Sequence, residues 1–209
     1  MIAIIDYKAG NLTSVKLAFE TLGVKAQITS DPKIIKKAER VVFPGVGAAS
    51  AAMRNLRDLN LIPVIQNVIA DKMPFLGICL GTQIILDHSE EDGGVETLGL
   101  IPGNVVRFTP ANRQDKVPHM GWNRVQATQQ HPVLTGIPNH SEFYFVHSYY
   151  PVPSKAQYTF AETNYADATF AAALGHDNVF ATQFHPEKSG RIGLQLLQNF
   201  LNWNPEGDA

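Results

Sequence analysis

The first 88 residues alternate short apolar runs with amphipathic stretches, and this alternation is the strongest constraint on the fold. The apolar runs have the length of buried strands, whereas the stretches that follow them space their apolar residues at helical intervals. The predicted strands are residues 2–5, 25–29, 40–43 and 75–78, and the predicted helices are residues 11–22, 32–38, 48–56, 61–71 and 82–88. Strand, loop and helix in repeated order predict a parallel sheet with helices on both faces.

The rest of the chain has a different rhythm, in which short strand candidates are separated by Gly, Pro and Asn turns. These strands are predicted at residues 105–109, 122–127, 143–149, 158–163, 170–174 and 179–184, and a closing helix at residues 193–203. Such a rhythm is typical of antiparallel hairpins added to a sheet. We therefore expect one α/β domain over residues 1–209, with a mixed, mostly parallel, flavodoxin-like central sheet. The functional site should lie at the carboxyl ends of the strands.

Composition narrows the possible classes of function. The chain has 17 basic and 19 acidic residues, and its net charge of −2 offers no basic surface for nucleic acid. No apolar run approaches the ~18 residues of a membrane span, and the run before Asp6 is too short for the core of a signal peptide. A single cysteine excludes an internal disulfide. We therefore expect a cytoplasmic protein without nucleic-acid or membrane partners.

Cys79 lies between glycines in residues 77–81 (Gly-Ile-Cys-Leu-Gly), where a predicted strand turns into a predicted helix. Small residues two positions before and after a nucleophile are typical of a nucleophile elbow, a tight turn that leaves the side chain protruding above the sheet. The amino end of the following helix favours a thiolate there. A cysteine in an apolar segment can also be a buried space-filling residue, and the pattern at Cys79 alone leaves both interpretations open.

His185 follows an apolar strand and belongs to residues 184–187 (Phe-His-Pro-Glu). In an extended segment His185 and Glu187 point to the same side, and Pro186 keeps the residue before it extended. A carboxylate beside an imidazole orients the ring and stabilises its protonated form. The pair alone would also fit a solvated strand end, but together with Cys79 it predicts a Cys-His-Glu triad.

These two motifs resemble the class I (triad) glutamine amidotransferases. The resemblance rests on residues 77–83 (Gly-Ile-Cys-Leu-Gly-Thr-Gln) and 185–187 (His-Pro-Glu). Other motifs are similar to one branch of this family, the glutaminase subunits of imidazole glycerol phosphate synthases in histidine biosynthesis. They are residues 5–12, 44–47, 120–123, 144–149 and 185–189. Lys8 departs from the glycine that is usual in this branch, which leaves the shape of the first loop open.

The resemblance implies a thioester mechanism that needs no cofactor and no metal. Cys79 would attack the side-chain amide of glutamine, and His185 would protonate the departing ammonia and then activate water. Glu187 would orient His185. Backbone N–H groups of Val46 and Leu80 would hold the oxyanion. The positions that match the glutamine-binding residues of the family are Gly47, Gln83, Glu91, Ser148 and Tyr149, with Glu90 adjacent to Glu91 as an alternative.

The Gly-Val-Gly sequence of residues 45–47 also has the form of half a dinucleotide-binding fingerprint. It follows a later strand rather than the first, however, and Ser50 stands where the third glycine would be. No acidic residue closes the next strand to bind a ribose. We therefore predict that this loop does not bind a nucleotide.

The resemblance also implies a partner, because ammonia released into solvent would be lost. The glutaminase domain is expected to use the whole chain, so the acceptor enzyme would be a separate (βα)8-barrel cyclase in a heterodimer. Asn11, Trp122 and Lys188 match positions at or near that interface. A solvated surface lysine and a core aromatic are the simple alternatives for Lys188 and Tyr144, whereas an exposed tryptophan is typical of interfaces.

Three rival functions share part of this pattern. A glutaminase of another synthase, such as the anthranilate or pyridoxal phosphate systems, agrees poorly with residues 6–11 and Lys188. A cysteine-dependent peptidase or deglycase on a similar elbow would not need Gln83 or Glu187. A catalytically silent binding module would not need the complete triad. Glutamine turnover in the presence of a cyclase distinguishes these functions.

Overall fold

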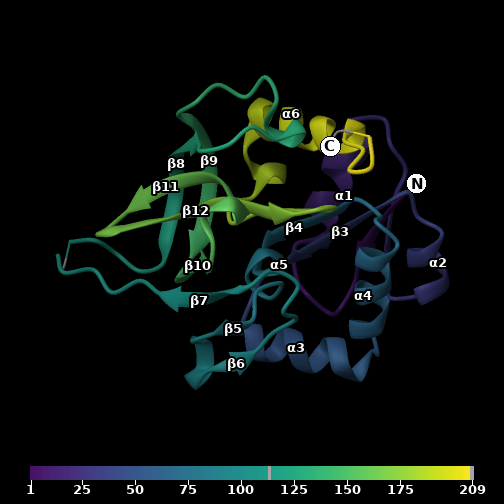
Figure 1. The fold of residues 1–209 in the computed structure, drawn as a ribbon, viewed down its shortest axis with the longest axis horizontal. Helices are drawn as coiled ribbons and strands as arrows, with labels where there is room; N and C mark the ends of the chain where they lie inside the picture. Colours follow the sequence, from purple (N-terminus) through teal and green to yellow (C-terminus); the bar gives the residue numbers. More distant parts are fainter. Residues whose placement is uncertain (113, 208–209) are drawn as a thin grey trace.

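The computed structural model describes residues 1–112 and 114–207, which form a nine-stranded sheet and a separate four-stranded sheet (Figure 1). The strand order of the large sheet is β2-β1-β3-β4-β13-β12-β11-β8-β9. Its strands are β1 (Ile2–Ile5), β2 (Ala26–Thr29), β3 (Arg40–Gly45), β4 (Phe75–Cys79), β8 (His119–Ala127), β9 (Ser141–His147), β11 (Thr159–Tyr165), β12 (Ala168–His176) and β13 (Val179–Thr182). In this order, neighbouring strands from β2 to β13 are parallel, and neighbouring strands from β13 to β9 are antiparallel. The expected mixed α/β sheet is confirmed, but it is not mostly parallel, because four of its strand pairs are parallel and four are antiparallel.

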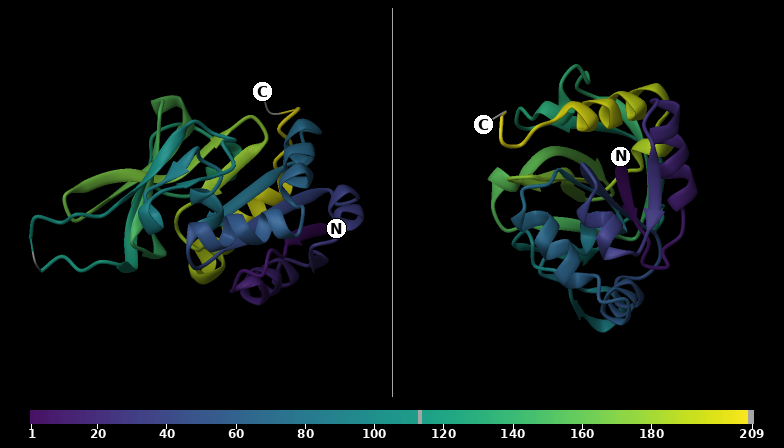
Figure 2. Two further views of the ribbon diagram at one scale, coloured as in Figure 1. Left: turned by 90° about the horizontal axis from the view of Figure 1, so that it is seen from below. Right: turned by 90° about the vertical axis from the view of Figure 1, so that its right-hand side faces the viewer.

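Helices cover both faces of the parallel part of the sheet (Figure 2). They are α1 (Leu12–Thr21), α2 (Pro32–Lys36), α3 (Ala49–Asp58), α4 (Ile62–Ala70) and α6 (Gly190–Asn202). Because side chains alternate along a strand, Ile2 and Ile4 of β1 pack in one core with α1 and α6. Ala3 and Ile5 pack in the other core with α2, α3 and α4. An apolar run without polar alternation therefore marks a strand that is buried on both faces.

The predicted helix at residues 82–88 is wrong, because only one helical turn, α5 (Leu80–Gln83), follows the elbow. The carbonyl of Ile84 accepts its hydrogen bond from Leu98 N–H, and the carbonyl of Ile85 accepts from Leu100 and Ile101. These cross-chain bonds take the place of the bonds that would continue the helix. The chain passes instead into a two-residue strand, β5 (His88–Ser89).

The predicted strand at residues 143–149 is two strands, because β9 ends at His147 and β10 (Tyr149–Pro153) begins after Ser148. β10 belongs to the four-stranded sheet, whose order is β10-β7-β5-β6. Its other members are β7 (Gly103–Arg107), β5 and β6 (Val95–Glu96). Pro151 and Pro153 conceal β10 in the sequence, since proline is rare inside sheets. The carbonyl of Ser148 accepts from Phe108 N–H and ties the junction to the β7 side.

Three parallel strands bring their carboxyl ends together at one place. The register pairs Gly45 at the end of β3 with Cys79 at the end of β4. β13, which leads to His185, pairs with β4 on its other side. Segments that lie far apart in the sequence therefore meet at the edge where parallel α/β sheets place their sites.

Candidate active site

The turn at Cys79 has the conformation of a nucleophile elbow. Cys79 has φ 54° and ψ −108°, which is rare for a residue other than glycine. A Cβ at Gly81 would overlap the carbonyl oxygen of Phe43, and one at Gly77 would lie 2.9 Å from the Cβ of Ala181. Close approach of the Ala181 side chain at Gly77 and of the Phe43 carbonyl at Gly81 thus requires the two flanking glycines. The helix after Cys79 is a single turn, so its dipole acts on the sulfur less than a longer helix would.

The sulfur of Cys79 lies beside a buried amide and a backbone carbonyl. Its thiol donates to the Val146 carbonyl at 3.9 Å, and the side-chain amide of Gln183 donates to the sulfur at 3.8 Å. Gln183 is fully buried and was missed in the sequence. A signal was present, because a glutamine in an otherwise apolar strand end must have a buried hydrogen-bond partner.

His185 and Glu187 lie together as predicted, but by a different local geometry. β13 ends at Thr182, and residues Pro186–Lys188 form a 3-10 turn instead of an extended segment. The turn brings the Glu187 carboxylate back to the ring, so His185 Nδ1 lies 2.7 Å from Glu187 Oε1. The side chains are 1% and 0% exposed. A buried, charge-assisted contact of this kind fixes the orientation of the imidazole.

The surroundings of His185 favour its protonated form. Burial lowers the pKa of His185, but the charges of Cys79 and Glu187 and the hydrogen bonds with them outweigh burial and raise it to about 10. The charges around the ring therefore favour an imidazolium, the partner that activates a cysteine nucleophile.

A cavity of about 300 Å³ opens over Cys79. Its lining contains every residue predicted to bind the oxyanion or glutamine: Val46, Gly47, Leu80, Gln83, Glu91, Ser148 and Tyr149. Pro118, Val146 and His147 also line it and were not predicted. Residues from the ends of β3 and β4, from the loop after β5 and from the junction of β9 and β10 thus converge on one cavity.

Gln83 and Glu91 each hold a neighbouring segment. Gln83 donates to the Tyr149 carbonyl at 2.8 Å and to the Gln183 side chain at 3.0 Å. Glu91 Oε2 accepts from Ala49 N–H, the first residue of α3, at 2.6 Å. Burial raises the pKa of Glu91. The hydrogen bond from Ala49 lowers this pKa, and the charge of Asp92 raises it. A partly buried carboxylate with this surplus of negative charge favours a cationic ligand group.

A pair of buried histidines supports the wall of the cavity. His147 Nδ1 lies 2.8 Å from the Tyr149 carbonyl, and His147 Nε2 lies 3.1 Å from His119 Nδ1. Burial lowers the pKa of His147 to about 3 and that of His119 to about 4. Because both rings are neutral at physiological pH, each must donate from one nitrogen and accept at the other. This requirement fixes both tautomers, with each Nδ1 as the donor.

The three residues predicted at a partner interface have different surroundings. Trp122 is 55% exposed and its ring centroid lies 6.1 Å from that of Tyr144. The Lys188 ammonium lies over the Tyr144 ring, 5.9 Å from its centroid. Tyr144 is half-buried, and its carbonyl accepts from His185 N–H at 2.9 Å. Asn11 is half-buried and its side chain contacts Glu187 at 2.6 Å.

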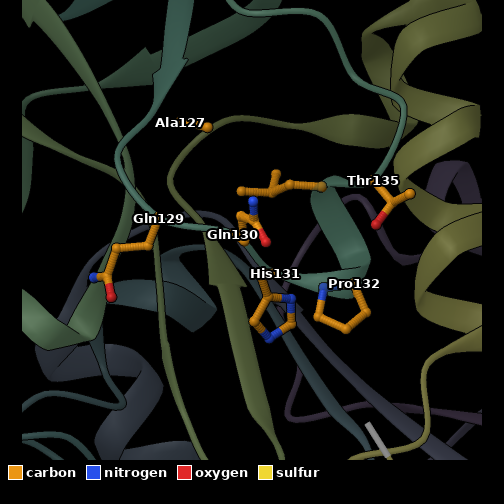
Figure 3. Close-up of a pocket in the computed structure, with 7 residues that line it drawn as sticks. Ala127, Gln129, Gln130, His131, Pro132 and Thr135 are labelled. Carbon is orange, nitrogen blue, oxygen red and sulfur yellow. The ribbon is translucent and has the colours of Figure 1, made fainter. Parts of the chain in front are cut away.

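A larger hollow of about 630 Å³ lies elsewhere, beside the end of β8 and the short helix Pro132–Leu134 (Figure 3). Its lining is mainly amide and apolar side chains around His131, which accepts from Val133 N–H. It contains no nucleophile beside a base and an orienting carboxylate, so we assign the chemistry to the Cys79 cavity. Among the residues that the structure describes, no cluster of His, Cys, Asp and Glu could hold a metal ion.

Within the same described ranges, no helix has the length and apolar character needed to cross a membrane.

Comparisons with known proteins agree with this geometry. A family model described as glutamine amidotransferase class-I matches residues 3–203. The chain is 52% identical to the imidazole glycerol phosphate synthase subunit HisH of Nitrosococcus oceani, over 97% of each chain. It is 48% identical to the protein of that name from Aromatoleum aromaticum, over 98% of this chain and 99% of the relative.

Solved structures of low sequence identity share the fold. PurLQS from Thermotoga maritima is similar with a TM-score of 0.73 and 17% identity, over 96% of this chain and 97% of that chain. The glutaminase domain of Trypanosoma brucei CTPS with bound acivicin is similar with a TM-score of 0.67 and 18% identity, over 97% and 94% of the two chains.

Proposed function

The chain belongs to the class I glutamine amidotransferases, and from this premise we propose that it is the glutaminase subunit of an imidazole glycerol phosphate synthase. It hydrolyses glutamine to glutamate and ammonia for a cyclase partner in histidine biosynthesis. The names of relatives about half identical over nearly the whole chain support this choice over other synthases. The observation that carries the chemistry is the buried His185–Glu187 contact of 2.7 Å, together with Cys79 in the lining of the cavity.

The proposed reaction begins when the Cys79 thiolate attacks the side-chain amide carbon of glutamine. Protonated His185 gives its proton to the leaving nitrogen, ammonia departs and a γ-glutamyl thioester remains. His185 then takes a proton from water, which hydrolyses the thioester. Glu187 keeps the ring oriented and stabilises its charge through both steps.

The proposed oxyanion site combines the backbone N–H of Leu80 with one from the Val46 segment, and the pairing of Gly45 with Cys79 supports this. Two such donors in a site that excludes water stabilise the developing negative charge. We assign the α-ammonium group of glutamine to the Glu91 carboxylate, and its α-carboxylate to the wall formed by Gln83, Ser148 and Tyr149. Their place around one cavity supports the assignment.

We propose that the (βα)8-barrel cyclase docks on the face that carries Trp122, Tyr144 and Lys188. Met120 is 63% exposed on the same strand as Trp122, and large exposed apolar groups beside a cation are typical of interfaces. The heterodimer would work in the cytoplasm, where a catalytic thiol stays reduced. The isolated chain is expected to hydrolyse glutamine poorly if residues 45–47 present a carbonyl to the site, because one oxyanion donor is then missing and kcat falls by roughly 10²–10³. Docking would turn residues 45–47 so that an N–H faces the site.

The test replaces Cys79 in the reconstituted heterodimer. Cys79→Ala should abolish glutamine-dependent synthesis and leave synthesis from added ammonium salts largely intact, because the thiol acts only in releasing ammonia. If both activities fell equally, Cys79 would be a structural residue and the proposed role would be wrong. Glutaminase kcat of the chain alone, with cyclase and with cyclase plus its ligand tests the activation, and full activity in the isolated chain would contradict it.

A further inference from the structure

Asn11 precedes helix α1 but does not cap it. Asparagine at this position normally accepts a hydrogen bond from the first turn of the helix, from an extended backbone conformation. Asn11 has a left-handed backbone, with φ 68° and ψ 12°, and its side chain makes no hydrogen bond to the helix. The usual reason for an asparagine at a helix start is therefore absent here. Another contact must account for this conformation.

The Asn11 side chain reaches the catalytic carboxylate instead. Its Nδ2 donates to Glu187 Oε1 at 2.6 Å, across a sequence separation of 176 residues. The same oxygen lies 2.7 Å from His185 Nδ1. We propose that Asn11 is a positioning residue, whose amide holds the Glu187 carboxylate so that one oxygen faces both the amide and the His185 ring. The inference rests on the proposed function, since it assigns Asn11 to the machinery of that reaction.

The sharing of one oxygen explains why Asn11 matters. In the described part of the chain, Glu187 Oε2 is buried and has no hydrogen-bond partner. The carboxylate is therefore held through Oε1 alone, by one amide donor and one imidazole donor. Without the Asn11 amide only the imidazole would hold the carboxylate that is meant to orient it. A positioned base loses efficiency when its orienting group is free to turn.

The loop that carries Asn11 also touches the oxyanion segment. A Cβ at Gly10 would lie 2.8 Å from Val46 Cγ2, and one at Gly45 would overlap the hydroxyl of Tyr7. Residues 7–11 therefore pack on residues 45–46 and hydrogen-bond to Glu187. Placement of this one loop determines the surroundings of both the oxyanion donors and the triad.

The simple alternative is that Asn11 serves only to bind the cyclase, as the family resemblance implies. That role would change the affinity for the cyclase and leave kcat of the saturated complex unchanged. A positioning role would lower kcat at saturation. The two roles are thus distinguished by glutaminase kinetics measured with excess cyclase, after the affinity of each variant for the cyclase has been determined.

The first variant is Asn11→Gly, which removes the amide and still allows the left-handed backbone. Its matched control is Asn60→Gly, because Asn60 is also an asparagine with positive φ, 53°, but is exposed and follows α3. We expect Asn11→Gly to lower glutaminase kcat of the saturated complex about tenfold to a hundredfold, the effect of one hydrogen bond to a charged group. Asn60→Gly should leave kcat unchanged. Ammonium-dependent synthesis should persist in both.

The second variant, Asn11→Asp, gives a signature that packing alone would not. When the new carboxyl group at position 11 is ionised, its charge repels the carboxylate of Glu187. When the group is protonated, its O–H can donate to Glu187 Oε1, as the Asn11 amide does. The activity ratio of Asn11→Asp to the unmodified protein should therefore rise several-fold as pH falls. Cys79, Glu187 and His147 surround the His185 ring in both proteins, so the ratio reports only what residue 11 changes, including its coupling to Glu187.

Two results would overturn the inference: unchanged kcat in Asn11→Gly at saturating cyclase, or an activity ratio of Asn11→Asp that does not depend on pH. Failure of the proposed function would look different, because the unmodified complex would then hydrolyse no glutamine. In that case alkylation of Cys79 by iodoacetamide in the full chain still decides the role of Asn11. Slower alkylation in Asn11→Gly than in Asn60→Gly supports positioning, and equal rates refute it.

Discussion

Replacement of Glu187 by glutamine tests how the triad is held. Oε1 of Glu187 accepts hydrogen bonds from both His185 at 2.7 Å and Asn11 at 2.6 Å, so its position requires a hydrogen-bond acceptor. The side-chain oxygen of a glutamine would therefore occupy it, and the new NH₂ group would replace Oε2. The ring would keep its tautomer, with Nδ1 as the donor, and lose only the negative charge beside it.

The magnitude follows from the hydrogen bond to His185. A bond to a charged group contributes about 1.5–3 kcal/mol and a neutral bond about 0.5–1.5 kcal/mol. The loss of about 1–2 kcal/mol in the stabilisation of the imidazolium corresponds to a fall in kcat of about 5- to 30-fold. The new NH₂ group would be buried without a partner, which costs about 1–3 kcal/mol of folding free energy. His185→Ala removes proton transfer itself and should lower kcat by about 10²–10⁴.

The assay is glutaminase kcat of the saturated complex for Glu187→Gln, His185→Ala and Cys79→Ala, with thermal unfolding recorded for each variant. We expect Glu187→Gln to retain clearly more activity than the other two variants. If Glu187→Gln were as inactive as His185→Ala while its complex stayed folded, the carboxylate charge would be indispensable. The account of a neutral oxygen held by Asn11 would then be wrong.

Three further predictions concern stability and the elbow. Lys8→Gly should stabilise the protein by about 1 kcal/mol, measured by urea unfolding, because Lys8 has φ 64° and glycine has no left-handed penalty; a destabilised variant would contradict this. Gly81→Ala should abolish glutaminase activity or folding, because its Cβ would overlap the Phe43 carbonyl, and a fully active variant would refute the elbow geometry. His119 and His147 have pKa values lowered to about 4 and 3, so the stability they contribute is complete above about pH 6.5 and is lost progressively as pH falls from there to those values. Unfolding free energies at pH 7 and pH 5 should therefore differ less in a His119→Gln variant than in the unmodified protein, and an equal difference would exclude this cause.

Local patterns in the sequence predicted the elements that position the site. Glycines at 77 and 81 indicated the elbow by their spacing around Cys79, although the atoms that exclude a side chain there belong to the distant residues Phe43 and Ala181. The apolar runs predicted the parallel strands because burial on both faces leaves no polar alternation. Asp31 predicted the start of α2, where its carboxylate accepts from Lys33 N–H at 2.8 Å. In each case a short run of neighbouring residues carried the signal.

Features set by distant contacts were not predicted. The helix expected at residues 82–88 is cut short by bonds from residues 98–101, which no local pattern reveals. The contact between His185 and Glu187 was predicted, but from an extended segment instead of the 3-10 turn that makes it. The hydrogen bond from Asn11 to Glu187 joins residues that are 176 positions apart in the sequence. The roles of the predicted site residues stay predictions, although Cys79 and the residues predicted to bind the oxyanion and glutamine line one cavity.

The most direct measurement is the detection of the covalent intermediate. The complex is incubated with isotopically labelled glutamine, quenched in acid within a turnover and digested for peptide mass spectrometry. The account predicts a labelled γ-glutamyl thioester on the peptide that contains Cys79, present with the cyclase and its ligand and absent in Cys79→Ala. Glutamine turnover without label on Cys79, or turnover that survives Cys79→Ala, would contradict the assignment of Cys79 as the nucleophile.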